Sequence, residues 1–195
     1  MKLGSVTPYY KRKVRSNLLG LYGQATSENI DNGLRWYKTA NVICNELAME
    51  FDTTTERVAQ VLSALSPRNK WERNIIDTRA VLEAVRDGID PSEVKVCTFN
   101  SNKTKAFAIA KGELDIQQES PKTYSFVRNI SALDENKVTI DVWHLRACFG
   151  KTITSGLTPL RYEELERLTI KLAERLGLRG YEFQAIVWDT IRQKH

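Results

Sequence analysis

The sequence has no apolar run long enough to span a membrane, and its start, MKLGSVTPYYKRKVR, lacks the apolar segment of a signal peptide. We therefore expect a cytoplasmic protein with no membrane partner. Cysteine is scarce too. The three thiols, Cys44, Cys97 and Cys148, are far apart, and they are too few for a four-cysteine iron–sulfur loop. We expect them to be buried and reduced.

Histidine is rarer still, with His144 and the terminal His195 as the only two. His144 is not grouped with Cys, His or Asp residues at the spacing of a metal site, so we predict no metal and no cofactor. Strand-forming runs are nearly absent, and the apolar residues recur mostly at helical spacing. The pattern predicts an all-α fold, a compact domain of eight or nine helices.

The chain has 195 residues, of which 42% are hydrophobic and 27% charged, as is typical of a single globular domain over residues 1–195. We expect it to be a monomer. Its net charge is +5, and part of the excess lies in a basic N-terminal arm, residues 1–15. A basic arm fits an anionic partner such as nucleic acid, but a solvated terminus has the same composition.

Residues 120–150 contain two helix starts joined by a short extended segment. A Ser-Pro start signal places Lys122 in the first turn of the first helix. Residues 138–140 are β-branched and favour an extended backbone. Asp141 follows them and is the natural N-cap of a second helical pattern. The sequence therefore predicts a lysine and an aspartate at two helix starts that face one cleft.

This layout, with nineteen positions from Lys122 to Asp141, resembles the catalytic segment of the helix-hairpin-helix DNA glycosylases. It looks closest to the 8-oxoguanine DNA glycosylase and endonuclease III branches. In that family a lysine opens a helix, an extended link follows, and a catalytic aspartate lies in a V-D-x-H-like run, here residues 140–144. Upstream, residues 61–69 (VLSALSPRN) resemble the family's helix that ends in a Leu-Ser element. The resemblance covers about residues 56–150.

The resemblance implies a DNA glycosylase with AP-lyase activity, which excises a damaged or modified base that has been lifted out of the stack. Lys122 would attack the deoxyribose C1′ and form a Schiff base, so its amine must be partly neutral at working pH. Asp141 would stabilise the positive charge that develops at C1′. Taken alone, Lys122 is a surface lysine at a helix start and Asp141 an ordinary helix cap.

Further residues are candidates for DNA contacts. Arg68 lies where the family inserts a polar side chain into the space left by the flipped base, with Asn69 as the second choice. An exposed turn between two helices would have the same sequence. Arg146 lies where the endonuclease III branch tends to carry an arginine. Lys103 and Lys105 either meet phosphates or form the solvated side of an amphipathic helix.

His144 follows Asp141 by three positions and therefore lies on nearly the same helix face. It either touches a substrate phosphate, orients the Asp141 carboxylate, or is a buried histidine with satisfied hydrogen bonds.

One departure from the family concerns the hairpin, an L-P-G-x-G pattern expected at residues 116–120, which are IQQES here. Both glycines are missing. Because those glycines let backbone N–H groups approach a DNA phosphate, ordinary duplex binding through this hairpin is in doubt. Two alternatives stay open: a glycosylase-fold enzyme, of the phage type, that processes a hypermodified base or nucleotide, and a non-catalytic nucleic-acid-binding module.

Overall fold

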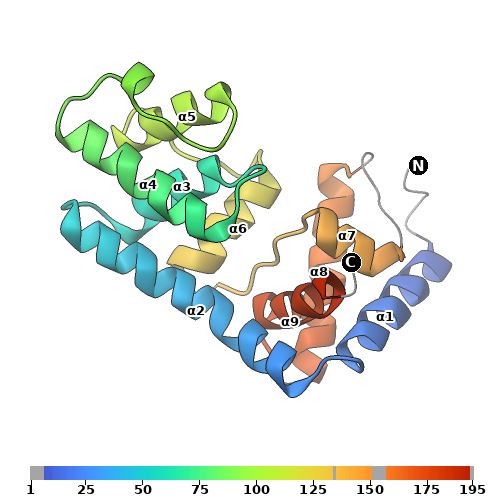
Figure 1. Cartoon of the computed structure of the whole chain (residues 1–195). Coiled ribbons are helices and arrows are strands. Elements are labelled where there is room, and N and C mark those ends of the chain that lie inside the picture. Colours follow the sequence, from blue (N-terminus) through green and yellow to red (C-terminus); the bar gives the residue numbers. More distant parts are fainter. Residues whose placement is uncertain (1–6, 134, 151–156, 194–195) are drawn as a thin grey trace. The chain divides into compact units, whose positions relative to one another are not determined.

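The computed structural model describes residues 7–133, 135–150 and 157–193, and in these ranges it contains helices and no strand (Figure 1). The all-α prediction is confirmed. In chain order the helices are α1 (Pro8–Tyr22), α2 (Ser27–Glu50), α3 (Thr55–Leu65), α4 (Trp71–Arg86), the 3-10 helix η1 (Pro91–Glu93), α5 (Asn100–Ala110), α6 (Pro121–Ser131), α7 (Val142–Phe149), α8 (Pro159–Arg175) and α9 (Gly180–Arg192).

Local capping chemistry explains where several helices begin. Thr7, Thr54 and Thr158 each accept a hydrogen bond from the backbone N–H three residues ahead, which satisfies one of the free donors of the first turn. Because Thr7 caps α1, the helix begins inside the predicted basic arm, and the described part of that arm is helical. Residues 1–6 of the arm lie outside the described residues.

The contacts divide the chain into two compact units. The terminal unit consists of Met1–Thr39 and Leu133–His195, and the central unit is Ala40–Ala132. The first boundary falls inside α2, which continues as one helix from the terminal unit into the central unit (Figure 1).

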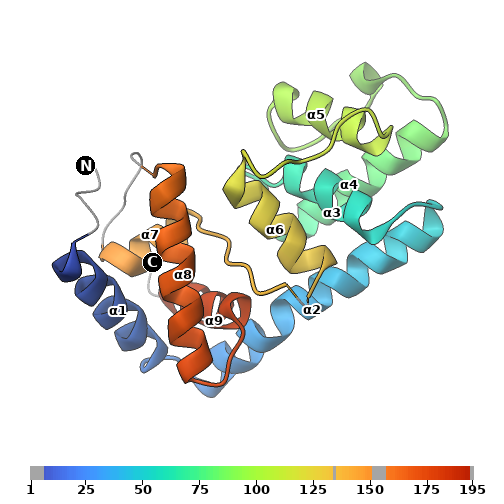
Figure 2. The ribbon, with the colours of Figure 1, turned by 180° about the vertical axis from the view of Figure 1, so that it is seen from behind.

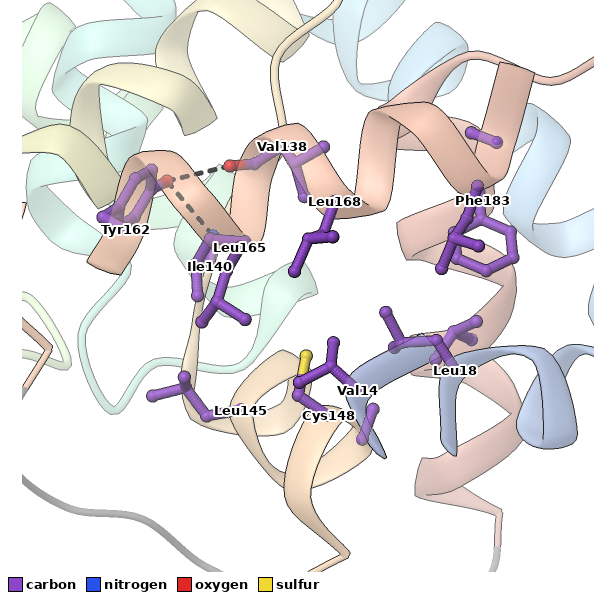
Figure 3. Packing of buried hydrophobic residues seen from close by; sticks show 14 of the residues in the cluster. Val14, Leu18, Val138, Ile140, Leu145, Cys148, Tyr162, Leu165, Leu168 and Phe183 are labelled. Atoms are coloured by element: carbon purple, nitrogen blue, oxygen red, sulfur yellow. Dashed lines mark hydrogen bonds between the residues drawn. The ribbon is translucent and has the colours of Figure 1, made fainter. Parts of the chain in front are cut away.

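The core of the terminal unit is built by α1, α7, α8 and α9 (Figures 1 and 2). Residues buried from solvent meet there from all four helices, among them Val14, Leu18, Cys148, Leu165 and Phe183 (Figure 3). Burial of this apolar surface is the main stabilising term for such a unit.

One buried hydroxyl in this core holds the extended segment that leads to Asp141 (Figure 3). Tyr162 of α8 donates its hydroxyl hydrogen to the Val138 carbonyl at 2.8 Å and accepts from the Ile140 N–H at 3.1 Å. Val138 and Ile140 are themselves buried. In an extended segment outside a sheet, the backbone N–H and C=O groups have no helical or sheet hydrogen bonds. The Tyr162 hydroxyl therefore provides a hydrogen-bond partner for two buried backbone groups of segment 138–140.

The central unit is organised around α3. All eight residues 58–65 of this helix are buried, and α4, α5 and α6 pack against it (Figure 1). The second part of α2 adds Cys44 and Leu47 to the buried set. It is joined to α6 by a hydrogen bond from the Asn41 amide to the Ile130 carbonyl at 2.7 Å.

Within the terminal unit, α2 and α9 approach so closely that only glycine fits at position 33. A Cβ built on Gly33 would lie 2.4 Å from Ile186 Cγ1 and 2.5 Å from the Ile186 backbone N. We therefore expect Gly33→Ala to lower the free energy of unfolding by about 1–3 kcal/mol, although alanine favours helices, because the overlap outweighs the gain in propensity. Urea-induced unfolding measures the change.

Gly20 of α1 is the matched control, because nothing lies within 4 Å of its Cβ position. There Gly20→Ala should be neutral or raise stability by up to about 1 kcal/mol. Equal effects at the two positions would contradict the close approach of α2 to α9.

Candidate functional site

Asp141 lies in the terminal unit and caps α7, as predicted. Its Oδ1 accepts a hydrogen bond from the backbone N–H of His144 at 2.7 Å, and the residue is partly exposed. The segment before it is fixed by Tyr162 and the helix after it by the cap itself. The carboxylate is therefore held in place from both sides along the chain.

Lys122 lies in the central unit, as the second residue of α6, and is exposed. Its position in the first turn agrees with the prediction. Ser120 occupies the N-cap without a side-chain hydrogen bond, and the first turn contains no acidic residue. The two predicted catalytic residues thus come from different units.

The loop before Lys122, residues 111–120, is held by polar side chains of α3. Gln60 accepts a hydrogen bond from the Ile116 N–H at 2.6 Å, and Arg57 binds the Asp115 carboxylate at 2.8 Å and the Leu114 carbonyl at 3.0 Å. The Ile116 N–H therefore points into the protein. A family hairpin would offer backbone N–H groups here to a phosphate, and this loop uses one of them internally.

The same loop borders an open pocket of about 370 Å³ in the central unit. Its charged walls are already paired, since Arg57 binds Asp115 at 2.8 Å and Arg128 binds Glu56 at 3.1 Å. Tyr124 of α6 is another of its lining residues. The pocket marks the place where the loop packs on α3, and its paired charges give it no evident ligand.

Arg68 and Asn69 lie in the turn between α3 and α4 and differ in exposure. Arg68 is exposed, with φ of +60°, and its guanidinium carbon lies 5.1 Å from the centre of the Phe99 ring. A side chain in this left-handed region costs about 1–2 kcal/mol. Asn69 instead donates to the Asp77 carboxylate at 2.9 Å, which gives it a structural role.

Asp77 is fully buried in the central unit and organises this region. Besides the Asn69 amide, it accepts from Arg73 Nε at 2.8 Å and from the Cys97 backbone N–H at 2.7 Å. A buried carboxylate is tolerated when several donors surround it. Asp77 therefore fixes the turn at Asn69 against the segment at Cys97.

The remaining predicted cations are partly buried. Lys103 of α5 lies near Asp90, whose pKa is lowered mainly by hydrogen bonds from Ser92, with smaller contributions from Lys111 and Lys103. Lys105 lies on the same helix. Arg146 places its guanidinium carbon 4.4 Å from the centre of the Trp143 ring on α7. A role for these three cations in binding phosphate stays a prediction.

His144 is a core residue with 1% of its surface exposed. Thr169 donates its hydroxyl hydrogen to the Leu165 carbonyl at 2.8 Å, so at 3.0 Å it accepts from His144 Nε2–H. Nδ1 then carries no proton and has no partner among the described residues. Burial lowers the pKa of His144 to about 4. The predicted contact with DNA therefore has no support from this buried, neutral side chain.

Among the described residues, no group of three or more His, Cys, Asp or Glu side chains is placed to hold a metal ion. In the same part of the chain, every helix is too short or too polar to cross a bilayer. Cys44 and Cys148 are buried and free, whereas Cys97 is free but exposed, which corrects the expectation for that one thiol.

The helices and the contacts among them make this an all-α protein of two helical units over the described residues. A model of a family described as "Family of unknown function (DUF7178)" matches residues 2–195, so the chain belongs to that family. No curated protein and no solved structure matches the chain. Membership covers nearly the whole sequence and assigns no activity.

Sequence patterns missed Asp77 and Phe99. Asp77 is a single acidic residue on an apolar helix, and its only local sign is Arg73, four positions earlier, because its other donors are distant in sequence. Phe99 looks like a core residue until its exposure, 50%, is known. The sequence signal for an exposed Phe99 was its position directly before a helix whose first half contains asparagines and lysines.

His144 makes the stability of the chain depend on pH. Its pKa is lowered from 6.5 to about 4, so between these values the unfolded chain binds a proton that the folded chain does not. The contribution of His144 to the free energy of unfolding is therefore constant well above pH 6.5 and falls as the pH drops through and below 6.5. Between about pH 7.5 and about pH 5 we expect a loss of about 2 kcal/mol from this group, measured by urea unfolding.

The control is His144→Gln, which cannot titrate in this range. It should lower stability at neutral pH yet lose about 2 kcal/mol less than the native chain on acidification. A pH dependence unchanged by His144→Gln would disprove the assignment.

Proposed function

We propose that this protein is a DNA glycosylase with AP-lyase activity, with Lys122 as nucleophile and Asp141 as the carboxylate that stabilises the cation at C1′. The observation that carries the proposal is the placement of both residues. Lys122 lies in the first turn of α6, Asp141 caps α7, and an extended segment precedes the cap. These local features, a lysine in a first helical turn and an aspartate cap after an extended segment, are the ones on which the resemblance to helix-hairpin-helix DNA glycosylases rests.

Lys122 suits the nucleophilic role because its side chain is exposed and the first turn of α6 contains no acidic residue to bind it. In the proposed reaction the neutral amine forms a bond to C1′ as the bond from C1′ to the base breaks, and the base leaves with the electron pair. The attached amine then loses a proton, and the bond from C1′ to the ring oxygen breaks as that oxygen takes the electron pair and a proton, which leaves a Schiff base. Loss of a proton from C2′ then expels the 3′ phosphate with the electron pair of its C3′–O bond.

Asp141 suits the electrostatic role because its carboxylate is fixed before any substrate arrives. One oxygen is bound to the His144 N–H at 2.7 Å, and Tyr162 holds the segment that precedes it. A charge that is already oriented needs no reorganisation when positive charge develops at C1′, which is the larger part of its catalytic effect.

One observation favours a second candidate, an enzyme of the same chemistry that acts on a hypermodified base or nucleotide and not on ordinary duplex DNA. Loop 111–120 is bound to α3 through Gln60 and Arg57, and the Ile116 N–H is used in that contact. A loop held in this way has at least one backbone donor fewer to offer to a duplex.

The lyase step can be tested without knowing the target base. DNA with a single abasic site exposes the aldehyde that the lysine attacks, and borohydride reduces the Schiff base to a stable adduct. We expect the chain to form this adduct and Lys122→Gln to form none. Lys111→Gln removes another exposed lysine of the central unit and should leave the adduct unchanged. An adduct that persists in Lys122→Gln would reject the mechanism.

Asp141→Asn separates catalysis from helix capping, because asparagine caps helices about as well as aspartate. We expect stability to change by less than about 0.5 kcal/mol, whereas release of the base from modified-base DNA slows about 100-fold. Thermal unfolding and base release measure the two effects. A variant with full activity would remove Asp141 from the mechanism, and absence of activity from every substrate would favour a non-catalytic module.

A further inference from the structure

Two loops of the central unit place an arginine against an exposed aromatic ring. The first loop, residues 66–70, joins α3 to α4, and the second, residues 95–99, leads into α5. Phe99 is 50% exposed, and the Arg68 guanidinium carbon lies 5.1 Å from the centre of its ring. Arginine stacks on aromatic faces in this way, and both residues of the pair are exposed.

The two loops are bound to each other, so the pair is formed in advance of any ligand. Buried Asp77 accepts hydrogen bonds from Asn69 in the first loop at 2.9 Å and from the Cys97 N–H in the second at 2.7 Å. The Thr98 hydroxyl adds a bond to the Pro67 carbonyl at 3.1 Å. A ligand that meets this surface orders little that is not already ordered.

The charge of the two loops is of one sign at the surface. Their sequences, SPRNK and KVCTF, contain Arg68, Lys70 and Lys95, all exposed, and no acidic residue. In the central unit, which is described throughout, none of these three cations forms an ion pair. The surface therefore combines an exposed aromatic ring with three cations that form no ion pair in the central unit.

In a second arginine–phenylalanine cluster of the same unit, the arginines are paired with carboxylates. Arg79 and Arg86 lie over the Phe51 ring, at 5.9 Å and 5.3 Å. Glu50 binds Arg79, Asp87 binds Arg86, and Phe51 is half-buried. That cluster is neutralised within the protein, which makes it the natural comparison.

We propose that the Arg68–Phe99 surface binds an unpaired nucleobase of a nucleic acid, which stacks on the pair while Lys70 and Lys95 meet neighbouring phosphates. An aromatic face stacks with any base, and uncompensated cations attract the phosphate backbone. Paired bases keep their faces inside the duplex, so the surface selects single-stranded or locally opened nucleic acid. The inference shares the nucleic-acid partner of the proposed function and does not depend on Lys122 or Asp141.

The test measures binding by fluorescence anisotropy in the Lys122→Gln chain, so that no covalent step contributes. The probes are a labelled single strand of mixed sequence and the same strand in a fully paired duplex. We expect tighter binding of the single strand. Phe99→Ala and Phe99→Leu should weaken single-strand binding about tenfold, and Phe99→Tyr should retain it. Circular dichroism checks that each variant is folded, and Phe99→Leu keeps the apolar contact without the aromatic face.

Matched substitutions test the charges. Arg68→Gln should weaken single-strand binding, whereas Arg86→Gln at the neutralised cluster should leave it within about twofold. Lys70→Gln and Lys95→Gln should each reduce the dependence of log affinity on log salt concentration by about 0.7. Equal affinity for single strand and duplex, or binding that is unchanged in Phe99→Ala, would overturn the inference. If the native chain forms no borohydride adduct while single-strand binding still depends on Phe99, the proposed glycosylase activity is rejected and the inference about the Arg68–Phe99 surface stands.

Discussion

The hydroxyl group of Tyr162 is the contact on which the geometry around Asp141 depends. It binds the carbonyl of Val138 and the N–H of Ile140, two buried groups in a segment that has neither helix nor sheet to satisfy them. Because α8 holds the segment in this way, α7 begins at a defined place and Asp141 caps it. The direction of the carboxylate is thus set by a residue twenty-one positions later in the chain.

In the central unit, Asp77 holds irregular backbone in a corresponding way, but with a carboxylate in place of a hydroxyl. Tyr162 is one group that both donates and accepts, whereas Asp77 is a buried carboxylate that only accepts, from a side-chain amide, a guanidinium and a backbone N–H. Both residues connect irregular backbone to a helix. The functional candidates Asp141, Arg68 and Phe99 all lie on backbone that such a buried polar residue holds, so the positions of these candidates depend on the core.

Local signals were enough to predict most helices and the positions of Lys122 and Asp141 at two helix starts. Thr54 and Asp141 are caps whose partners lie three residues away, and a pattern of that range can be found in the sequence. The division into two units could not be found, because it depends on contacts between distant segments. The burial of His144 was one of three possibilities, and the sequence could not choose among them because α7 has only eight residues, too few for the spacing of apolar side chains to separate its inner and outer faces.

The path of the chain through the two units has a consequence for the order in which they fold. Residues 40–132 of the central unit are continuous, whereas the terminal unit needs α1 and the start of α2 together with everything after Leu133. During synthesis the central unit can complete its contacts while α1 still waits for α7, α8 and α9 to leave the ribosome. Until then the apolar faces of Val14 and Leu18 have no partners, and this interval is when a nascent chain of this kind is most exposed to chaperones and to aggregation.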